Sequence, residues 1–135
     1  MKKIPSWQFG DTKKEADYLQ GLVISGKKTA TSSLYESYLD KKMPLPKVGD
    51  KNVILDSKGR KRCSIITTKA SHKPFSKVSA AFAFKEGEGD RSLAYWRKAH
   101  KKFFEKRLEK MKRKFDENTL IVCEEFKVLK IFDLQ

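Results

Sequence analysis

Amines and hydroxyls crowd together in one short stretch near the start of the chain, Gly26-Lys27-Lys28-Thr29-Ala30-Thr31-Ser32-Ser33. A lysine amine can act as a base or as a fixed positive charge, and a hydroxyl can act as a nucleophile. If the stretch is extended, Lys28 and Ser32 face one side and Thr31 faces the other, so a bend is needed before Lys28 and Thr31 could share a cleft. The alternative is a plain strand or loop edge without a catalytic role.

A second stretch, Glu86-Gly87-Glu88-Gly89-Asp90-Arg91, places three carboxylates at alternate positions of an otherwise basic chain. Its glycines let the backbone turn closely, so Glu86 or Glu88 could reach a cleft for acid or base catalysis, or could hold a divalent cation. The stretch lacks the length of an EF-hand loop, which makes a metal the weaker option. In the structural alternative, the glycines form a turn and Asp90 caps the next helix.

Aromatic rings lie beside basic groups at two places, Trp7-Gln8-Phe9 and Tyr95-Trp96-Arg97 with His100. Such neighbours suit the stacking of single-stranded bases. We expect Trp96 to be a core residue and Trp7 to be the better stacking candidate, because Trp7 lies in a segment without helical periodicity. The two histidines, His72 and His100, have no partner spacing typical of zinc or of a Ser-His pair.

The elements that must position these groups begin with a helix predicted over 12–24, where Thr12 opens a capping box and Gly26 provides a left-handed end. A short helix is expected around 34–39. Two strand-like runs, over 52–56 and 62–68, predict a hairpin.

A second β pair is expected from 120–124 and 126–132. Between the two β pairs, the spacing of apolar residues predicts a long helix from Arg91 to about Lys114, capped by Asp90. Most of its remaining positions are basic, which indicates either a nucleic-acid surface or a merely solvated face.

The charge balance is strongly positive, with 31 Lys and Arg against 17 Asp and Glu in 135 residues, a net charge of +14. This length predicts a single domain over 1–135. The excess charge indicates a polyanion partner, RNA more than DNA, and the alternative is a solubility feature.

The expected location is cytoplasmic, because the chain contains no run of about 18 apolar residues and no signal-peptide pattern at its start. No membrane partner is expected. Cys63 and Cys123 each lie among β-branched or apolar residues, which predicts reduced, buried thiols rather than metal ligands.

Several of these motifs occur together, in order, over nearly the whole chain. They are Trp7-x-Phe9-Gly10-Asp11, the 26–32 stretch, Pro46-x-Val48-Gly49-Asp50, Pro74-Phe75-x-x-Val78, and the 86–104 run with Tyr95-Trp96-Arg97-x-x-His100-x-x-Phe103-Phe104. In this combination the sequence resembles the ASCH domain family. The resemblance implies an α+β fold, a small mixed PUA-like β-barrel of about five or six strands with flanking helices.

The resemblance also implies an RNA-related cleft between the barrel and its helices. Some members are ribonucleases acting on single-stranded RNA, and others are amidohydrolases that remove the acetyl group from N4-acetylcytidine. In the amidohydrolases the catalytic set is a Lys, a Thr three residues later and a downstream Glu, which correspond here to Lys28, Thr31 and Glu86, with Glu88 as the other candidate acid.

Three functions therefore stay open: a ribonuclease, an N4-acetylcytidine amidohydrolase, and a non-catalytic RNA-binding module. The ligand is expected to be RNA, a nucleoside or a nucleotide, with no required cofactor, no defined metal site, and a divalent cation as an option. The sequence does not indicate an oligomeric state. The candidate nucleic-acid contacts are Trp7, Lys27, Arg91, Arg97 and Lys101.

The protonation state of Lys28 separates two mechanisms. Burial would lower its pKa, and a neutral amine could then take a proton from Thr31 for attack on an acetyl carbonyl, with Glu86 protonating the leaving nitrogen. A charged Lys28 would instead stabilise a phosphorane while a carboxylate activates the 2′-hydroxyl or a water.

Overall fold

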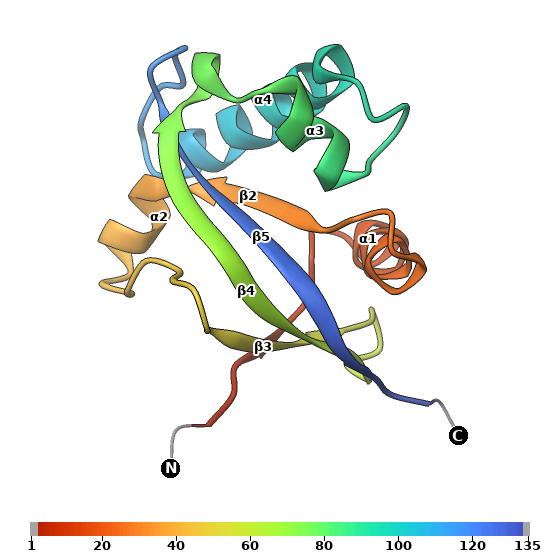
Figure 1. Ribbon diagram of the computed structural model, residues 1–135. Helices are drawn as coiled ribbons and strands as arrows, with labels where there is room; N and C mark the ends of the chain where they lie inside the picture. Colours follow the sequence, from red (N-terminus) through yellow and green to blue (C-terminus); the bar gives the residue numbers. More distant parts are fainter. Residues whose placement is uncertain (1–2, 134–135) are drawn as a thin grey trace.

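A computed structural model describes residues 3–133 (Figure 1). In chain order its elements are β1 (Ser6–Trp7), α1 (Lys13–Ser25), β2 (Ala30–Leu34), α2 (Tyr35–Asp40), β3 (Lys51–Leu55), β4 (Lys61–Pro74), a 3-10 turn (Phe75–Lys77), α3 (Ala80–Glu86), α4 (Leu93–Lys110) and β5 (Leu120–Ile131). The predicted mixture of helices and strands is confirmed.

The five strands form one sheet in the order β1-β3-β4-β5-β2. All neighbouring strands are antiparallel except β1 and β3, and the two longest strands, β4 and β5, pair with each other along most of their length (Figure 1). Within residues 3–133 the two end strands, β1 and β2, do not pair with each other, so the sheet is open rather than the closed barrel expected. Because β1 pairs over only Ser6 and Trp7, it offers little ladder for closure.

The first helix follows the prediction closely. The Thr12 hydroxyl accepts a hydrogen bond from the Glu15 amide, and Gly26 ends the helix with φ 86°. The long basic helix differs from the prediction at both ends. Ser92, not Asp90, caps α4, because the Ser92 hydroxyl accepts a hydrogen bond from the Tyr95 amide. The Asp90 carboxylate, two residues earlier, accepts instead from the Ser92 amide. The helix ends at Lys110.

The predicted β pair over 120–132 is wrong, because Leu120–Ile131 form the single strand β5. The first half of β5 pairs with β2 on one side and with β4 on the other, so pairing partners from elsewhere in the chain keep it extended. The hairpin of β3 and β4 is confirmed, although β4 runs on to Pro74. The seven-residue α3 was not predicted, since a helix this short shows almost no periodicity.

The core lies in two clusters. One packs α3 and α4 against β2 and β5, and includes Phe82, Trp96 and Phe104. The other packs α1 against β3, β4 and β5, and includes Val23 and Ile54. The segment Gly26–Thr29 runs between these clusters, at the junction of α1, β2 and α3 (Figure 1).

Both cysteines are buried and unpaired, as the sequence predicts. Burial raises the pKa of both Cys63 and Cys123 to about 11, which keeps them as thiols at neutral pH. Across residues 3–133, every helix is too short or too polar to cross a membrane.

Candidate active site

A buried lysine is the centre of the site. Lys28 is only 2% exposed, and its ammonium lies 2.8 Å from Oε1 of Glu86 and 3.2 Å from Oε2 of Glu88. The backbone around it is fixed from both sides, because the Lys28 amide donates to the carbonyl of Leu22 in α1 and the Thr29 amide donates to the carbonyl of Lys85 in α3. The Lys28 side chain is thus held at the carboxylates by two helices.

Glu86 is the last residue of α3 and is 1% exposed. While its Oε1 binds Lys28, its Oε2 accepts hydrogen bonds from the Ser32 hydroxyl at 2.5 Å and from the Trp96 indole at 2.7 Å. Every oxygen of this buried carboxylate is therefore satisfied, as burial of a charge requires.

His100 completes the group from the next turn of α4. Its ring stacks on Trp96 with centroids 4.4 Å apart, and its Nδ1 lies 2.9 Å from the Trp96 carbonyl. Because a carbonyl can only accept, Nδ1 carries a hydrogen. The other nitrogen, Nε2, faces the carboxylates, 3.4 Å from Glu86 and 3.9 Å from Glu88.

The loop after α3 brings Glu88 over Lys28. Gly87 and Gly89 adopt left-handed φ values of 77° and 59°, and a Cβ on Gly87 would lie 2.3 Å from the carbonyl oxygen of Lys27. The Arg91 guanidinium fastens the loop, donating to the carbonyls of Phe84 and Lys27. Gly87 is thus required for the close approach of two backbone segments, and Gly89 for the close approach of the loop to the Tyr95 ring.

The electrostatics favour a charged lysine. Burial by itself would lower the pKa of Lys28, but the adjacent Glu86 and Glu88 carboxylates outweigh it and raise the pKa above its usual range. The neutral amine of the deacetylation hypothesis is therefore not supported. Burial would likewise raise the pKa of Glu86, but Lys28 and His100 overcome this and lower it to about 2.

The same group has the donor set of a cation site. Ligand atoms of Glu86, Glu88 and His100 lie within 4.8 Å of one another. The Lys28 ammonium already lies at hydrogen-bond distance from both carboxylates. A divalent cation would have to displace this ammonium, which supplies the positive charge that the carboxylates need.

Thr31 lies elsewhere, on the opposite face of β2 from Ser32. It pairs with Glu124 on β5, whose carboxylate accepts a hydrogen bond from Thr67. Ser32, which was not among the predicted site residues, is the hydroxyl that reaches Glu86. The alternation that puts Lys28 and Ser32 on one side of an extended strand was the signal that could have identified it.

The five candidate nucleic-acid contacts separate into two kinds. Trp7 is half-buried, with its indole donating to Asn52, and the Arg97 guanidinium donates to the carbonyl of Ser76. Arg91 is used to fasten its loop. Of the five candidates, Lys27 and Lys101 are the exposed residues.

Lys28 does not line either of two surface pockets among residues 3–133, one between β4, β5 and α3 and the other beside Pro46 and His72. Glu88, with 17% of its side chain exposed, is the most accessible carboxylate of the group, ahead of Glu86 at 1%. Ligand access to Lys28 therefore passes through the position of Glu88.

Comparison with known proteins gives a consistent result. A family model described as the ASCH domain matches residues 5–130. The crystal structure of an ASCH domain from Lactobacillus crispatus JV V101 is 35% identical, with a TM-score of 0.88 over 92% of this chain and 78% of that one. A crystal structure from Enterococcus faecalis V583 is 36% identical, with a TM-score of 0.90 over 97% of this chain and 79% of that one.

The comparison with curated proteins gave no match. The family model covers most of the chain, and the two crystal structures share its arrangement of strands and helices. This chain belongs to the ASCH domain family, whose PUA-like fold is often linked to RNA binding.

Proposed function

We propose that this protein binds RNA or a nucleotide and cleaves single-stranded RNA at the group formed by Lys28, Glu86, Glu88 and His100. The observation that carries the proposal is the buried lysine between two carboxylates. Burying charges costs more than burying apolar side chains of the same volume, so such a group contributes little net stability. Its occurrence beside a glycine loop favours a catalytic role.

A charged lysine suits phosphodiester cleavage. In the proposed step the Glu88 carboxylate takes the proton of a ribose 2′-hydroxyl, whose oxygen forms a bond to phosphorus. The Lys28 ammonium offsets the charge on the phosphorane, the bond from phosphorus to the 5′-oxygen breaks, and His100 in its protonated form donates a proton to that oxygen. The products are a cyclic phosphate and a free 5′-hydroxyl.

Substrate entry requires Glu88 to move. The phosphate takes the place of the Glu88 carboxylate, which lies 3.2 Å from the ammonium and is the outermost partner of Lys28. Glu86 keeps the lysine in position from the buried side, at 2.8 Å. In this role Glu86 is a positioning residue and Glu88 is the catalytic base.

Deacetylation of N4-acetylcytidine is the second candidate, favoured by the hydrogen bond from the Ser32 hydroxyl to Glu86. A serine oxygen beside a carboxylate could attack an acetyl carbonyl. Two features weigh against it: the pKa of Glu86, lowered to about 2, makes it a weak base, and the charged Lys28 cannot accept a proton. A non-catalytic RNA-binding module is the third candidate.

One experiment separates the three. Purified protein is incubated with labelled single-stranded RNA and with N4-acetylcytidine, each with and without EDTA, and the products are identified by mass spectrometry. Strand cleavage with cyclic phosphate ends supports the proposal, acetate release supports the second candidate, and binding without either product supports the third.

A variant tests the assignment of the base. Glu88→Gln should lower cleavage by about a hundredfold or more, since a general base contributes about 10²–10⁴-fold. Glu109→Gln, an exposed carboxylate of α4, is the matched control and should leave the rate unchanged. Equal rates for the two variants would remove Glu88 from the mechanism.

The exposed basic face of α4 is the proposed RNA surface. Lys101, Lys102, Lys106 and Lys110 are exposed, so their replacement by glutamine should weaken RNA binding and flatten its salt dependence by about 0.7 per lost phosphate contact. An unchanged salt slope in fluorescence anisotropy titrations would show that this face is only solvated.

A further inference from the structure

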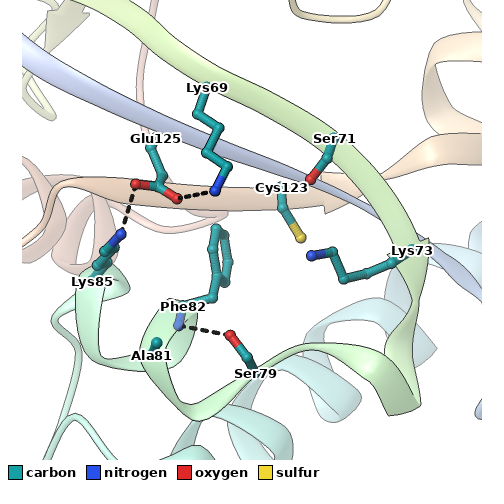
Figure 2. A pocket seen from close by; sticks show the side chains of 9 residues that line it. All are labelled: Lys69, Ser71, Lys73, Ser79, Ala81, Phe82, Lys85, Cys123 and Glu125. Carbon is teal, nitrogen blue, oxygen red and sulfur yellow. Dashed lines mark hydrogen bonds and ion pairs between the residues drawn. The ribbon is translucent and has the colours of Figure 1, made fainter.

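We infer that the pocket between β4, β5 and α3 is a binding site for a single phosphate group, placed next to the buried active-site carboxylate. Figure 2 shows this pocket, with three lysines and two serines around a floor of Phe82 and Cys123. The inference depends on the proposed function only for the identity of the larger ligand, RNA.

The charge of the pocket is unbalanced. Lys69, Lys73 and Lys85 line it, and Glu125 is its one carboxylate. Glu125 lies 2.9 Å from Lys85 and 3.9 Å from Lys69, whereas Lys73 has no ion-pair partner within residues 3–133. Lys73 extends into the pocket toward Cys123 (Figure 2). The lining therefore carries an excess of two positive charges, which an anion would offset.

The size and polar groups of the pocket fit phosphate. Its volume is about 130 Å³, whereas pockets for drug-sized ligands occupy about 300–1,000 Å³. This volume suits a single phosphate group better than a whole nucleotide. The hydroxyl of Ser79 accepts from the Phe82 amide and so keeps its own hydrogen to donate, and the Ser71 hydroxyl also lines the pocket. Lysines bind phosphate as point charges.

The location links the pocket to the active site. Cys123 in its floor is directly opposite Ser32 in the ladder of β5 and β2, and Ser32 donates to Glu86. Directly opposite side chains lie on the same face, with Cβ atoms about 5 Å apart. Lys85 in the wall is the chain neighbour of Glu86. A phosphate held here lies beside the site where Glu86 and Lys28 meet, as a flanking phosphate of a bound RNA strand would.

Three variants should change phosphate affinity in different directions. Lys73→Gln should weaken binding of inorganic phosphate and of cytidine monophosphate by about tenfold, because a hydrogen bond to a charged group is lost. Glu125→Gln should tighten binding, because it removes the competing carboxylate. Lys127 is an exposed lysine of β5, the strand of Glu125, and does not line the pocket. Lys127→Gln should leave phosphate affinity unchanged and controls for the loss of one positive charge.

Binding is followed by amide chemical shifts in NMR titrations, where the Phe82 and Cys123 signals should report the pocket. Inorganic phosphate, cytidine monophosphate and a short single-stranded RNA are separate titrants, and tighter binding of RNA than of free phosphate identifies the backbone as the natural source. Equal effects of Lys73→Gln and Lys127→Gln, or no shift at Phe82 and Cys123, would overturn the inference.

The result is independent of catalysis. Glu88→Gln should lower cleavage by about a hundredfold or more and leave phosphate binding at this pocket, read from the Phe82 and Cys123 signals, unchanged, since Glu88 does not line the pocket. If wild-type protein binds phosphate here but cleaves no RNA, the proposed reaction fails and the phosphate site stands. If RNA is cleaved while Lys73→Gln binds phosphate as tightly as wild type, the phosphate site fails alone.

Discussion

Two carboxylates, Glu86 and Glu124, lie against opposite faces of β2, and their pKa values are shifted in opposite directions. Glu86 meets Ser32 on one face and is paired with Lys28, so its pKa falls to about 2. Glu124 lies opposite Thr31 on the other face, where burial raises its pKa and a hydrogen bond from Thr67 only partly counteracts this. A hydrogen bond alone does not offset the cost of burying a carboxylate, whereas an adjacent cation does.

The largest effect is expected from removing the cation next to Glu86, the Lys28 ammonium. Lys28→Met keeps much of the side-chain volume but leaves Glu86 buried without its partner, so the free energy of unfolding should fall by about 3–5 kcal/mol. Urea unfolding at pH 7 measures the loss. Lys27→Met, at the exposed neighbouring position, should change stability by no more than about 0.5 kcal/mol.

A second variant separates charge from volume. Adding Glu86→Leu to Lys28→Met removes both charges and should recover most of the lost stability, because an apolar pair can replace a buried ion pair. A cost of Lys28→Met no larger than that of Lys27→Met would show that Glu86 does not depend on the lysine.

Acid should lower the free energy of unfolding by protonating Glu86. Its pKa is about 2 in the folded protein and 4.5 in its ordinary state, so the unfolded chain takes up the proton first as the pH falls. The stability that depends on the ionised Glu86 carboxylate is therefore complete above pH 4.5 and is lost as the pH falls from 4.5 to about 2. Urea unfolding across this range should show a steeper loss in wild type than in Glu86→Gln, and equal slopes would contradict the assignment.

The loop that holds Glu88 against Lys28 can be tested through Gly87. Its φ of 77° and the 2.3 Å approach of a Cβ to the Lys27 carbonyl both oppose a side chain, so Gly87→Ala should cost about 2 kcal/mol or more. Gly21→Ala is the matched control with the opposite sign: Gly21 lies in α1 with nothing within 4 Å of its Cβ position, and alanine there should stabilise the helix by about 1 kcal/mol. Thermal unfolding compares the two variants.

The smallest effect is expected at Glu124. Because its pKa is raised in the folded protein, the folded state holds the proton more tightly, and stability is lost as the pH rises through that pKa. Glu124→Gln should therefore give a small gain in stability at pH 7 and none at pH 4, measured by urea unfolding at both values. A loss at pH 7 would mean that ionised Glu124 has a stabilising partner.

Local signals predicted a large part of the fold. Thr12 and Gly26 bound α1 because caps act through their own neighbours, and the hairpin of β3 and β4 follows from two β-branched runs with a glycine turn between them. The long basic helix was predicted with its cap misplaced, since Asp90 and Ser92 are both good capping residues and only the backbone geometry decides between them.

The candidate site was predicted in part. The motif resemblance brought Lys28 together with Glu86 and Glu88, and the structure places the three within hydrogen-bond distance. The motif resemblance also paired Lys28 with Thr31. Because β2 is extended, Ser32 rather than Thr31 lies on the side of β2 that faces Glu86. Their roles in catalysis remain predictions.

By itself, the sequence determined most of the helical and strand segments, the strong positive charge, and the glycine turn that lets Glu88 approach Lys28, because each depends on neighbours in the chain or on composition. Tertiary structure alone decided that β5 is one strand, that the sheet is open, and that the pKa of Lys28 is raised rather than lowered. The physical reason is common to all three: strand pairing and the balance of burial against Coulomb attraction depend on groups from distant segments, such as β2 and β4 around β5, or Glu86 fifty-eight residues from Lys28.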